Sequence, residues 1–424
     1  MADDNVLKKV LDKIDDMKTE LVNATSALVQ IPSVHGEEAE AQAFMKARYE
    51  ELGLAVETFE ADLEEIKAHP AYIDTGHTYD DRPNVVGILD GLDDAPSLIL
   101  NGHVDVVSPE PIDKWTADPW GGEVKEGRMY GRGVYDMKAG VMANLFATRA
   151  ILESGLKPKG RLILQSVIEE EAGGSGGALA CFLKGYSADG MLVPEPSNHN
   201  VVISHAGVKY FRVKVLGKTA HAALSHTGVN AIGKMNQIYN ALIDLDERRA
   251  AQHDYPLLKH YSSRSCNLNI GTYRAGDWAS SVAGMAEMEC RVGFVPGEKG
   301  ADVMREVEDT ISSAVRDDDW LKENPPEVTW YGWDTEPWVQ DENDGFVQAF
   351  MSSSTEMLGE KPNLTGFPGA LDTRFAPYFG VPSLTFGPKG DRLHGPDEYV
   401  EIDSLVTVTK VIAKFILDWC GHVF

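Results

Sequence analysis

The sequence predicts an α/β protein: a mostly parallel, mixed sheet flanked by helices, with a smaller α+β domain inserted into it. A chain of 424 residues is too long for one ordinary core, so two domains are expected. In the first half, apolar runs of strand length alternate with helical patterns, which is typical of a parallel sheet covered by helices. Near residue 207 the pattern changes to alternating apolar and polar residues, as in a half-exposed antiparallel strand. We therefore expect a discontinuous first domain, residues 1–206 and 323–424, and an insert at residues 207–322.

The elements of the first domain follow from hydrophobic periodicity and from helix breakers. Apolar residues recur at helical spacing over residues 6–30, and Pro32 ends that predicted helix. A second helix is expected over residues 39–52. Further strands are predicted at residues 85–89, 98–100, 161–168 and 190–193, and further helices at residues 137–152 and 178–183.

The insert begins with an alternating strand at residues 210–215. A helix is expected to follow at residues 230–245. Strands are then predicted at residues 267–273 and 285–294, and a helix at residues 301–316. From Val328 onward the α/β pattern is expected to resume.

Charge and cysteine usage limit the class of protein. The formal net charge of −27 argues against nucleic acid or an anionic membrane as a partner. The N-terminus has no apolar core of signal-peptide type, and no apolar run approaches membrane-spanning length. The four cysteines are scattered, which indicates buried free thiols in a cytoplasmic protein; they are Cys181, Cys266, Cys290 and Cys420.

The segment LILNGHVD, residues 98–105, offers the first candidate metal ligand. Its apolar residues predict a buried strand, and ligands collect beyond the carboxyl ends of strands in such sheets. His103 and Asp105 follow there, two residues apart. A histidine that binds metal usually gives its second ring N–H to a partner such as a carboxylate. A hydrogen-bonded loop histidine beside a turn aspartate is the alternative.

Four more places put imidazole or carboxylate groups beside predicted strand ends. Asp136 lies in GRGVYDMKAG, where it could instead cap a helix. Residues 169–171 are three consecutive glutamates before AGGSGG, and such a cluster is costly unless cations compensate it. Glu195 in LVPEPS could be an ordinary surface residue. His394 lies in RLHGPDEYV, in a loop that no core-packing argument explains.

Two histidines and three carboxylates can hold two divalent cations, with one carboxylate shared; they are His103, Asp136, Glu171, Glu195 and His394. Nitrogen and oxygen ligands favour Zn²⁺, with Mn²⁺ or Co²⁺ as alternatives. Two such ions would polarise a carbonyl and lower the pKa of a bound water. Glu170, next to Glu171, is placed to take the proton from that water and pass it to a leaving nitrogen. Neighbouring side chains on extended backbone point opposite ways, so a turn must rotate one of them.

These motifs resemble, in order and over nearly the whole chain, the dinuclear zinc amidohydrolase family of acetylornithine deacetylase, succinyl-diaminopimelate desuccinylase, aminoacylases and glutamate carboxypeptidases. The resemblance implies a zinc-peptidase-like catalytic domain that hydrolyses a C–N bond of the amide type in a small molecule. It makes Asp136 the bridging ligand, with a cis peptide after it, and Glu170 the general base. The simplest activities it implies are N-acyl amino acid deacylation and dipeptide hydrolysis.

The same resemblance identifies the insert as a ferredoxin-like lid and dimerisation domain, and so implies a homodimer. His221, in GKTAHAALSHTGVNAI, matches a lid histidine that donates to the oxyanion. Arg291 in ECRVGF matches an arginine that binds a substrate carboxylate, and Arg374 in GALDTRF is expected to contribute similarly. Ser281 stands where many relatives have a substrate-holding asparagine, and Trp278 adds apolar surface nearby.

Two further departures are the glutamate at position 169, where relatives usually have aspartate, and a segment at residues 60–84 with no assigned role. We expect only a modest effect from the former. Ser281 and Trp278 keep a second hypothesis open, in which the same site acts as an amidase or deaminase on a non-peptide, aromatic amide or amine. A non-catalytic binding protein is disfavoured, because no ligand and no base is missing.

Overall fold

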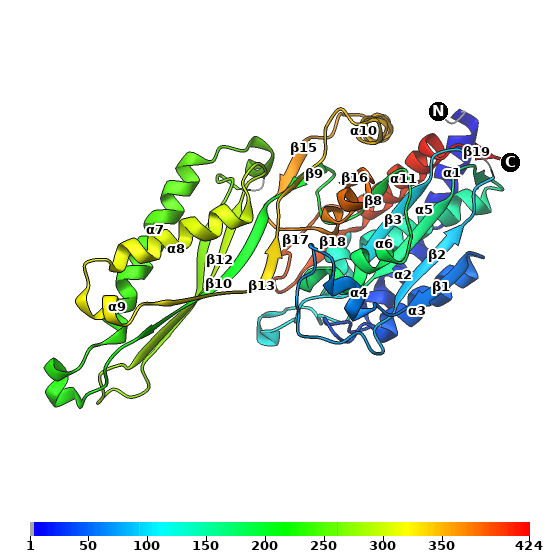
Figure 1. The fold of residues 1–424 in the computed structure, drawn as a ribbon. Coiled ribbons are helices and arrows are strands. Elements are labelled where there is room, and N and C mark those ends of the chain that lie inside the picture. The colour runs from blue at the N-terminus through cyan, green and yellow to red at the C-terminus, as the bar shows by residue number, and fades with distance from the viewer. Residues whose placement is uncertain (1–3, 93, 261) are drawn as a thin grey trace. The chain divides into compact units, whose positions relative to one another are not determined.

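The computed structural model describes residues 4–92, 94–260 and 262–424, drawn in Figure 1. The chain divides into two compact units. The first comprises residues 1–203, 340–364 and 371–424, and the second comprises residues 204–339 and 365–370. Both units are discontinuous in sequence. No helix of the described residues is long and apolar enough to cross a membrane.

The first unit is built on a large mixed sheet, as expected. Its strands are β1 (Ala55–Phe59), β2 (Asn84–Leu89), β3 (Leu98–His103), β7 (Leu162–Val167), β8 (Met191–Val193), β16 (Ser383–Thr385) and the first residues of β9 (Val201–His205), in the order β1-β2-β7-β3-β8-β16-β9. The pairings from β7 to β16 are parallel, whereas those on either flank are antiparallel. Three candidate ligands follow strands of this parallel centre: His103 ends β3, Glu171 follows β7 and Glu195 follows β8.

The register of β3 and β7 determines where the site lies. The two strands are parallel and buried throughout, and each begins with three apolar residues, at 98–100 and 162–164. Their pairing runs from Leu98 opposite Leu162 to His103 opposite Val167. The two strands therefore end side by side, which places the acidic triplet that follows β7 next to the histidine that ends β3.

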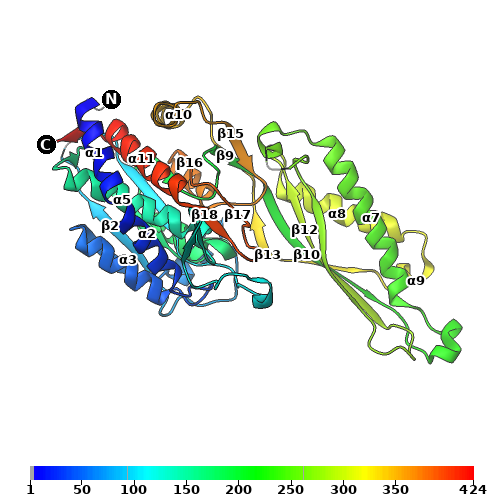
Figure 2. The ribbon, with the colours of Figure 1, turned by 180° about the vertical axis from the view of Figure 1, so that it is seen from behind.

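Helices cover this sheet; they are α1 (Asp4–Asp16), α2 (Lys18–Val29), α3 (Ala39–Glu51), α4 (Leu63–Lys67), α5 (Ala139–Glu153), α6 (Ala180–Leu183), α10 (Gly345–Leu358) and α11 (Ile402–Trp419). Helix α5 is the most buried, since it packs on β3 and β7 and is itself covered by α1, α2 and α11, as Figure 2 shows. The single helix predicted over residues 6–30 is two helices, because the backbone at the buried Met17 leaves the helical conformation, with ψ at 2°.

The second unit is an antiparallel sheet with two long helices. The strands are β10 (Gly207–Leu216), β11 (Leu268–Ala275), β12 (Met285–Phe294) and β13 (Glu327–Thr335), in the order β11-β12-β10-β13. The helices α7 (Ala231–Gln252) and α8 (Gly300–Val315) pack against one another and share one apolar core with this sheet. This is the α+β character expected of the insert.

The insert extends beyond the expected boundary at residue 322. Strand β13 pairs with β10, with Trp330 opposite Phe211, and the short strand β14 (Trp338–Val339) pairs with the last residues of β9. A strand has the same local pattern whichever sheet it joins, so the sequence alone could not assign β13. The four cysteines are free and buried, as expected.

Candidate metal centre

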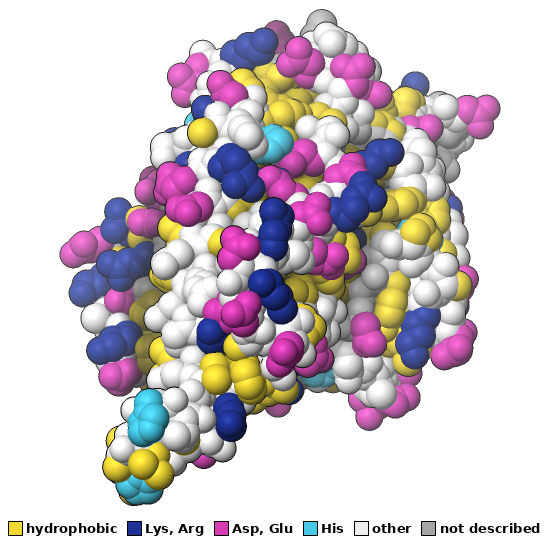
Figure 3. All heavy atoms as spheres, turned by 60° about the vertical axis from the view of Figure 1, so that its left-hand side comes forward, with side chains coloured by type: hydrophobic (Ala, Val, Ile, Leu, Met, Phe, Trp, Pro, Cys, Tyr) yellow, Lys and Arg dark blue, Asp and Glu magenta, His cyan; other side chains and the backbone are white. Residues whose placement is uncertain are grey.

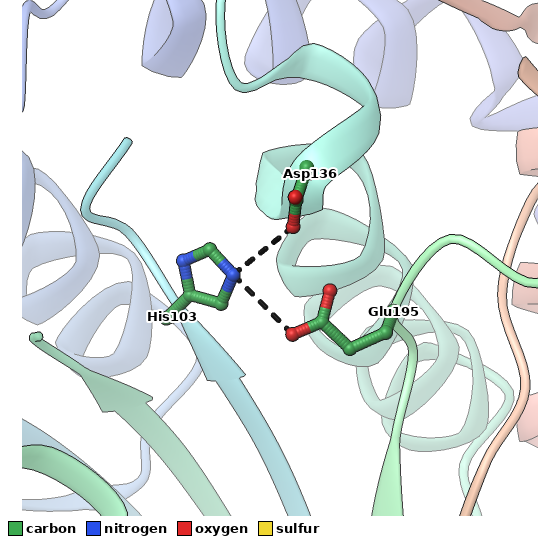
Figure 4. A group of neighbouring side chains, drawn as sticks. All are labelled: His103, Asp136 and Glu195. Atoms are coloured by element: carbon green, nitrogen blue, oxygen red, sulfur yellow. Dashed lines mark hydrogen bonds and ion pairs between the residues drawn. The ribbon is translucent and has the colours of Figure 1, made fainter. Parts of the chain in front are cut away.

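The five predicted ligands come together at the carboxyl ends of the central strands. They form two groups that share Asp136: one with His103 and Glu195, the other with Glu171 and His394. The His103 Nε2 atom lies 3.2 Å from Asp136 Oδ1 and 3.3 Å from Glu195 Oε1 (Figure 4). The His394 Nε2 atom lies 3.0 Å from Glu171 Oε2 and 3.1 Å from the second oxygen of Asp136. Each Asp136 oxygen thus faces a different group, as a shared carboxylate ligand would.

The other ring nitrogen of His103 is held by the residue predicted to orient it. Nδ1 lies 2.9 Å from the backbone oxygen of Asp105 and 3.5 Å from its carboxylate. That carboxylate accepts hydrogen bonds from the backbone N–H groups of Glu170 and Glu171, at 3.2 and 3.1 Å. Asp105 therefore contacts both the imidazole and the loop that follows β7.

The three consecutive glutamates point to different partners. Glu169 adopts a left-handed backbone conformation, with φ at 69°. This turn rotates the neighbouring side chains relative to one another, as expected from the sequence. Glu170 Oε2 lies 3.9 Å from His103 Nε2, and Glu171 contacts His394. The peptide bond between Asp136 and Met137 is cis, as the family resemblance implied.

Segment 60–84 contacts the carboxylate of Glu169, which is fully buried. Thr75 Oγ1 donates to it at 2.9 Å and the Tyr79 hydroxyl at 2.9 Å, while the backbone N–H of Gly176 donates at 2.6 Å. In the same segment, the N–H of Ile73 donates to the Ser175 hydroxyl at 2.9 Å. The segment that had no assigned role therefore holds the acidic triplet loop in place.

The pKa values of the clustered side chains indicate that the carboxylates of the centre repel one another and that bound cations would stabilise them. Burial, reinforced by the Asp136 charge, raises the pKa of Glu195 to about 8 and that of Glu171 to about 7. Burial and Glu195 likewise hold the pKa of Glu170 well above its usual range. Although burial opposes it, the surrounding carboxylates raise the pKa of His394 to about 10.

A metal ion fits these residues. Glu195 Oε1 is buried and lies 3.3 Å from His103 Nε2 without a well-aligned hydrogen bond, so a cation bound between the two atoms would satisfy both. The ligand atoms within each group lie within 4.8 Å of one another. A mixed set of imidazole and carboxylate donors suits Zn²⁺, Mn²⁺ or Co²⁺.

Two predicted residues of the lid lie together in the second unit. His221 and Ser281 form an isolated antiparallel bridge, and both are exposed. The His221 Nδ1 atom accepts the N–H of Ala223 at 3.1 Å, which leaves Nε2 directed elsewhere. Trp278 is 70% exposed. Their roles in catalysis and binding stay predictions.

Arg291 lines a cavity of about 350 Å³ in the second unit. Its guanidinium donates to Asn267 Oδ1 and to the backbone oxygen of Pro368, both at 3.0 Å. Burial lowers the pKa of Arg291 from its usual value. Both of these acceptors are neutral, and a guanidinium bonded to neutral groups is compatible with the predicted binding of a substrate carboxylate.

Arg374 is buried in the first unit. Its guanidinium donates to the backbone oxygens of Ala71, at 3.3 Å, and Gly173, and lies 3.9 Å from the centre of the Phe375 ring. It thereby joins segment 60–84 to the loop after the acidic triplet. Its predicted contribution to substrate binding stays a prediction.

Sequence reasoning missed three buried charged residues around the centre. Glu398 receives four hydrogen bonds from the turn that contains Asp136. Lys138 donates to the backbone oxygens of Leu28 and Ile31, at 3.1 and 2.8 Å. Asp372 is buried with one oxygen unpartnered, and burial raises its pKa to about 7. The sequence did offer a signal for them, because each lies within a motif that also contains a candidate site residue: Lys138 near Asp136, Asp372 near Arg374 and Glu398 near His394.

Comparisons with known proteins agree with the motifs. The profile of peptidase family M20/M25/M40 matches residues 99–418. The chain is 30% identical over 446 residues to N-formyl-4-amino-5-aminomethyl-2-methylpyrimidine deformylase of Bacillus subtilis (strain 168), covering 99% of each chain. It is 28% identical over 407 residues to succinyl-diaminopimelate desuccinylase of Methylorubrum extorquens (strain PA1), covering 92% of this chain and 96% of that one. Human carnosine dipeptidase 1 has a similar structure, with a TM-score of 0.76, 16% identity and coverage of 98% and 99%.

The chain therefore belongs to peptidase family M20/M25/M40. This confirms the resemblance carried by the five motifs and the fold that it implied. The protein is a metal-dependent hydrolase that acts on a carbon–nitrogen bond of the amide type in a small molecule.

Proposed function

We propose that the enzyme removes the acyl group from a small N-acylated substrate that bears a carboxylate, as an N-acyl amino acid deacylase or a dipeptidase. The observation that carries the proposal is the pair of ligand groups joined by Asp136, with Glu170 beside them. The desuccinylase and dipeptidase relatives support this substrate class. Arg291 is the candidate for binding the carboxylate.

The residues divide the chemistry among them. His103, Glu195, Glu171 and His394, with Asp136 shared, would hold two divalent cations, of which Zn²⁺ suits the donor set best. Such ions polarise an amide carbonyl and acidify water. Glu170 takes the proton from the attacking water and delivers it to the leaving nitrogen, a task for which its raised pKa suits it. His221 is the candidate donor to the developing oxyanion.

A specific similarity favours a second candidate substrate. A relative that matches 99% of the chain is named a deformylase of an aminomethylpyrimidine, so the alternative is an N-formyl or other short-chain amide of an arylmethylamine. Ser281 and the exposed Trp278 are compatible with this substrate. A panel of N-acyl amino acids, dipeptides and N-formyl arylmethylamines, tested with metal-loaded enzyme, separates the two candidates.

Glu170→Gln tests the proposed mechanism itself. On the best substrate of the panel, we expect kcat to fall by about 10²- to 10⁴-fold while metal content is unchanged. Glu51→Gln, on the exposed side of α3, is the matched control and should retain activity. Full activity of Glu170→Gln would contradict the assignment. A metal-loaded wild-type enzyme that hydrolyses no member of the panel would contradict the proposed substrate class.

We also infer that the enzyme is a homodimer formed through the second unit. Strand β11 is the edge of its sheet, and beside it α7 exposes a stripe of Ile232, Tyr239 and Ile243, each 37–39% exposed. Tyr273, on β11, stacks on Tyr239. A second copy can cover both the unpaired edge and this stripe. Light scattering should give twice the chain mass for the wild type and a smaller value for Tyr239→Glu; a monomeric wild type would contradict the inference.

A further inference from the structure

A single buried carboxylate organises the turn that presents the shared ligand. Glu398 lies four residues after His394 and is fully buried. Its Oε1 accepts the N–H groups of Tyr135 and Asp136, at 2.9 and 3.1 Å. Its Oε2 accepts the N–H of Gly133 at 3.1 Å and Arg132 Nη1 at 2.6 Å. An ionised carboxylate offers about four acceptor positions, so this one turn occupies all of them.

Arg132 extends the same network to the other ligand segment. Its side chain is 1% exposed, and its Nη2 donates to the backbone oxygen of His394 at 3.1 Å. The two segments are also held in register, because β18 (Tyr399–Glu401) pairs with β5 (Arg128–Tyr130). One ion pair thus joins two chain segments that carry ligands and lie 258 residues apart in sequence.

We propose that Glu398 and Arg132 are positioning residues of the metal centre, which together fix Asp136 relative to His394. This inference rests on the proposed function, since it takes both residues as ligands. Metal–ligand distances are about 2.0–2.2 Å and tolerate little error, so a small shift of either segment weakens the coordination. Asp136 belongs to both ligand groups, and a shift of its turn therefore affects both cations.

Glu398→Gln is the primary test. The amide NH₂ group must face either the N–H groups of Tyr135 and Asp136 or those of Arg132 and Gly133, so donors meet donors. We expect Zn²⁺ affinity, measured by competition with a chromogenic chelator, to fall by about 10- to 100-fold. The visible absorption spectrum of the Co²⁺-substituted protein should change too, because the geometry around the ions changes. Neither readout depends on activity.

Arg132→Lys provides a milder test should Glu398→Gln fold poorly. Lysine keeps the charge, but a single ammonium cannot replace the planar fork that reaches both Glu398 and His394. We expect a smaller loss of Zn²⁺ affinity than in Glu398→Gln. Glu298→Gln is the matched control, since Glu298 accepts two bonds from buried Arg249 and one from the N–H of Val295, in the second unit. It should lower stability and leave metal affinity unchanged.

The outcomes separate this inference from the proposed function. Loss of Zn²⁺ affinity in Glu398→Gln and Arg132→Lys, with none in Glu298→Gln, would support the positioning role. Folded variants that bind Zn²⁺ as the wild type does, with an unaltered Co²⁺ spectrum, would overturn it while leaving the enzyme's function intact. A wild-type protein that binds no divalent cation would instead overturn the proposed function.

Discussion

Three consecutive glutamates contact three different sets of partners, and the backbone conformation of the first one separates them. The left-handed conformation of Glu169 turns its carboxylate toward Thr75 and Tyr79, while Glu170 and Glu171 face the two histidines of the centre. Residue identity predicted that the triplet needs cations. It could not predict that the Glu169 carboxylate accepts hydrogen bonds from the hydroxyl groups of Thr75 and Tyr79, because those donors come from a distant segment.

His199 makes the stability of the protein depend on pH. Its Nε2 lies 2.6 Å from Ser404 Oγ, and burial together with Lys389 lowers its pKa to about 4 from 6.5. The unfolded chain binds the proton more tightly, so this contribution to stability is complete above pH 6.5 and is lost as the pH falls toward 4. The loss should reach about 2–3 kcal/mol.

Urea unfolding between pH 7 and 4 checks this expectation. His199→Asn should show a smaller decrease in unfolding free energy than the wild type, because it lacks the titrating group. His226→Asn, at an exposed position, is the control and should follow the wild type. Equal slopes for the wild type and His199→Asn would contradict the assignment.

At the scale of elements, the sequence predicted the helices and strands that have a regular hydrophobic period. The strands at residues 85–89 and 285–294 were predicted because buried strands are apolar or alternate. Of the five candidate ligands, which lie close together in the structure, His103, Glu171 and Glu195 were predicted from the strands they follow, whereas Asp136 and His394 were predicted from motifs in a turn and a loop. The sequence did not predict the position of segment 60–84, because its contacts to Glu169 are made by Thr75 and Tyr79, two polar side chains that belong to no periodic pattern. The break at Met17 was missed because the apolar spacing continues through it.

Tyr79→Phe measures how firmly this segment holds the triplet. Tyr79 is 4% exposed, and removing its hydroxyl takes one donor from the buried Glu169 carboxylate. We expect the unfolding free energy to fall by about 1–3 kcal/mol. Tyr72→Phe is the control in the same segment, where an exposed bond to Asp74 is lost and water can replace it. A similar, small effect for both variants would show that the segment is not a significant support.

At the scale of the whole molecule, domain order was predictable and the exact boundary was not. The change of pattern near residue 207 marks the start of the insert within a few residues, because antiparallel strands alternate where parallel ones do not. The end of the insert was placed at residue 322, before β13. Strand pairing is a long-range property, and local composition does not encode which partner a strand takes.

Net charge leads to a prediction about salt. The chain has 66 acidic and 39 basic residues, and on the face drawn in Figure 3 the two signs are interspersed. The excess of negative charge destabilises the compact state through self-repulsion, which salt screens. We expect the Tm to rise as NaCl increases from about 10 mM to about 500 mM and then to level off, since the Debye length falls from about 30 Å to a few Å.

Differential scanning calorimetry at fixed pH and fixed metal content makes this measurement. Sucrose, which stabilises by exclusion rather than by screening, is the control, and its effect should not saturate in the same way. A Tm that stays constant or falls with NaCl would show that the interspersed ion pairs outweigh the repulsion.

The distance in sequence between Asp136 and His394 also bears on how the protein is made. During synthesis the chain emerges in sequence order, so His103, Asp136, Glu171 and Glu195 leave the ribosome long before His394 is made. The first ligand group is complete at residue 195, and the second waits for residue 394 and for the carboxylate of Glu398 that secures its turn. Until then the growing chain contains all three residues of the first group, but Glu171 lacks its partner His394. A nascent chain therefore contains the three candidate ligands of the first group well before it contains all three of the second.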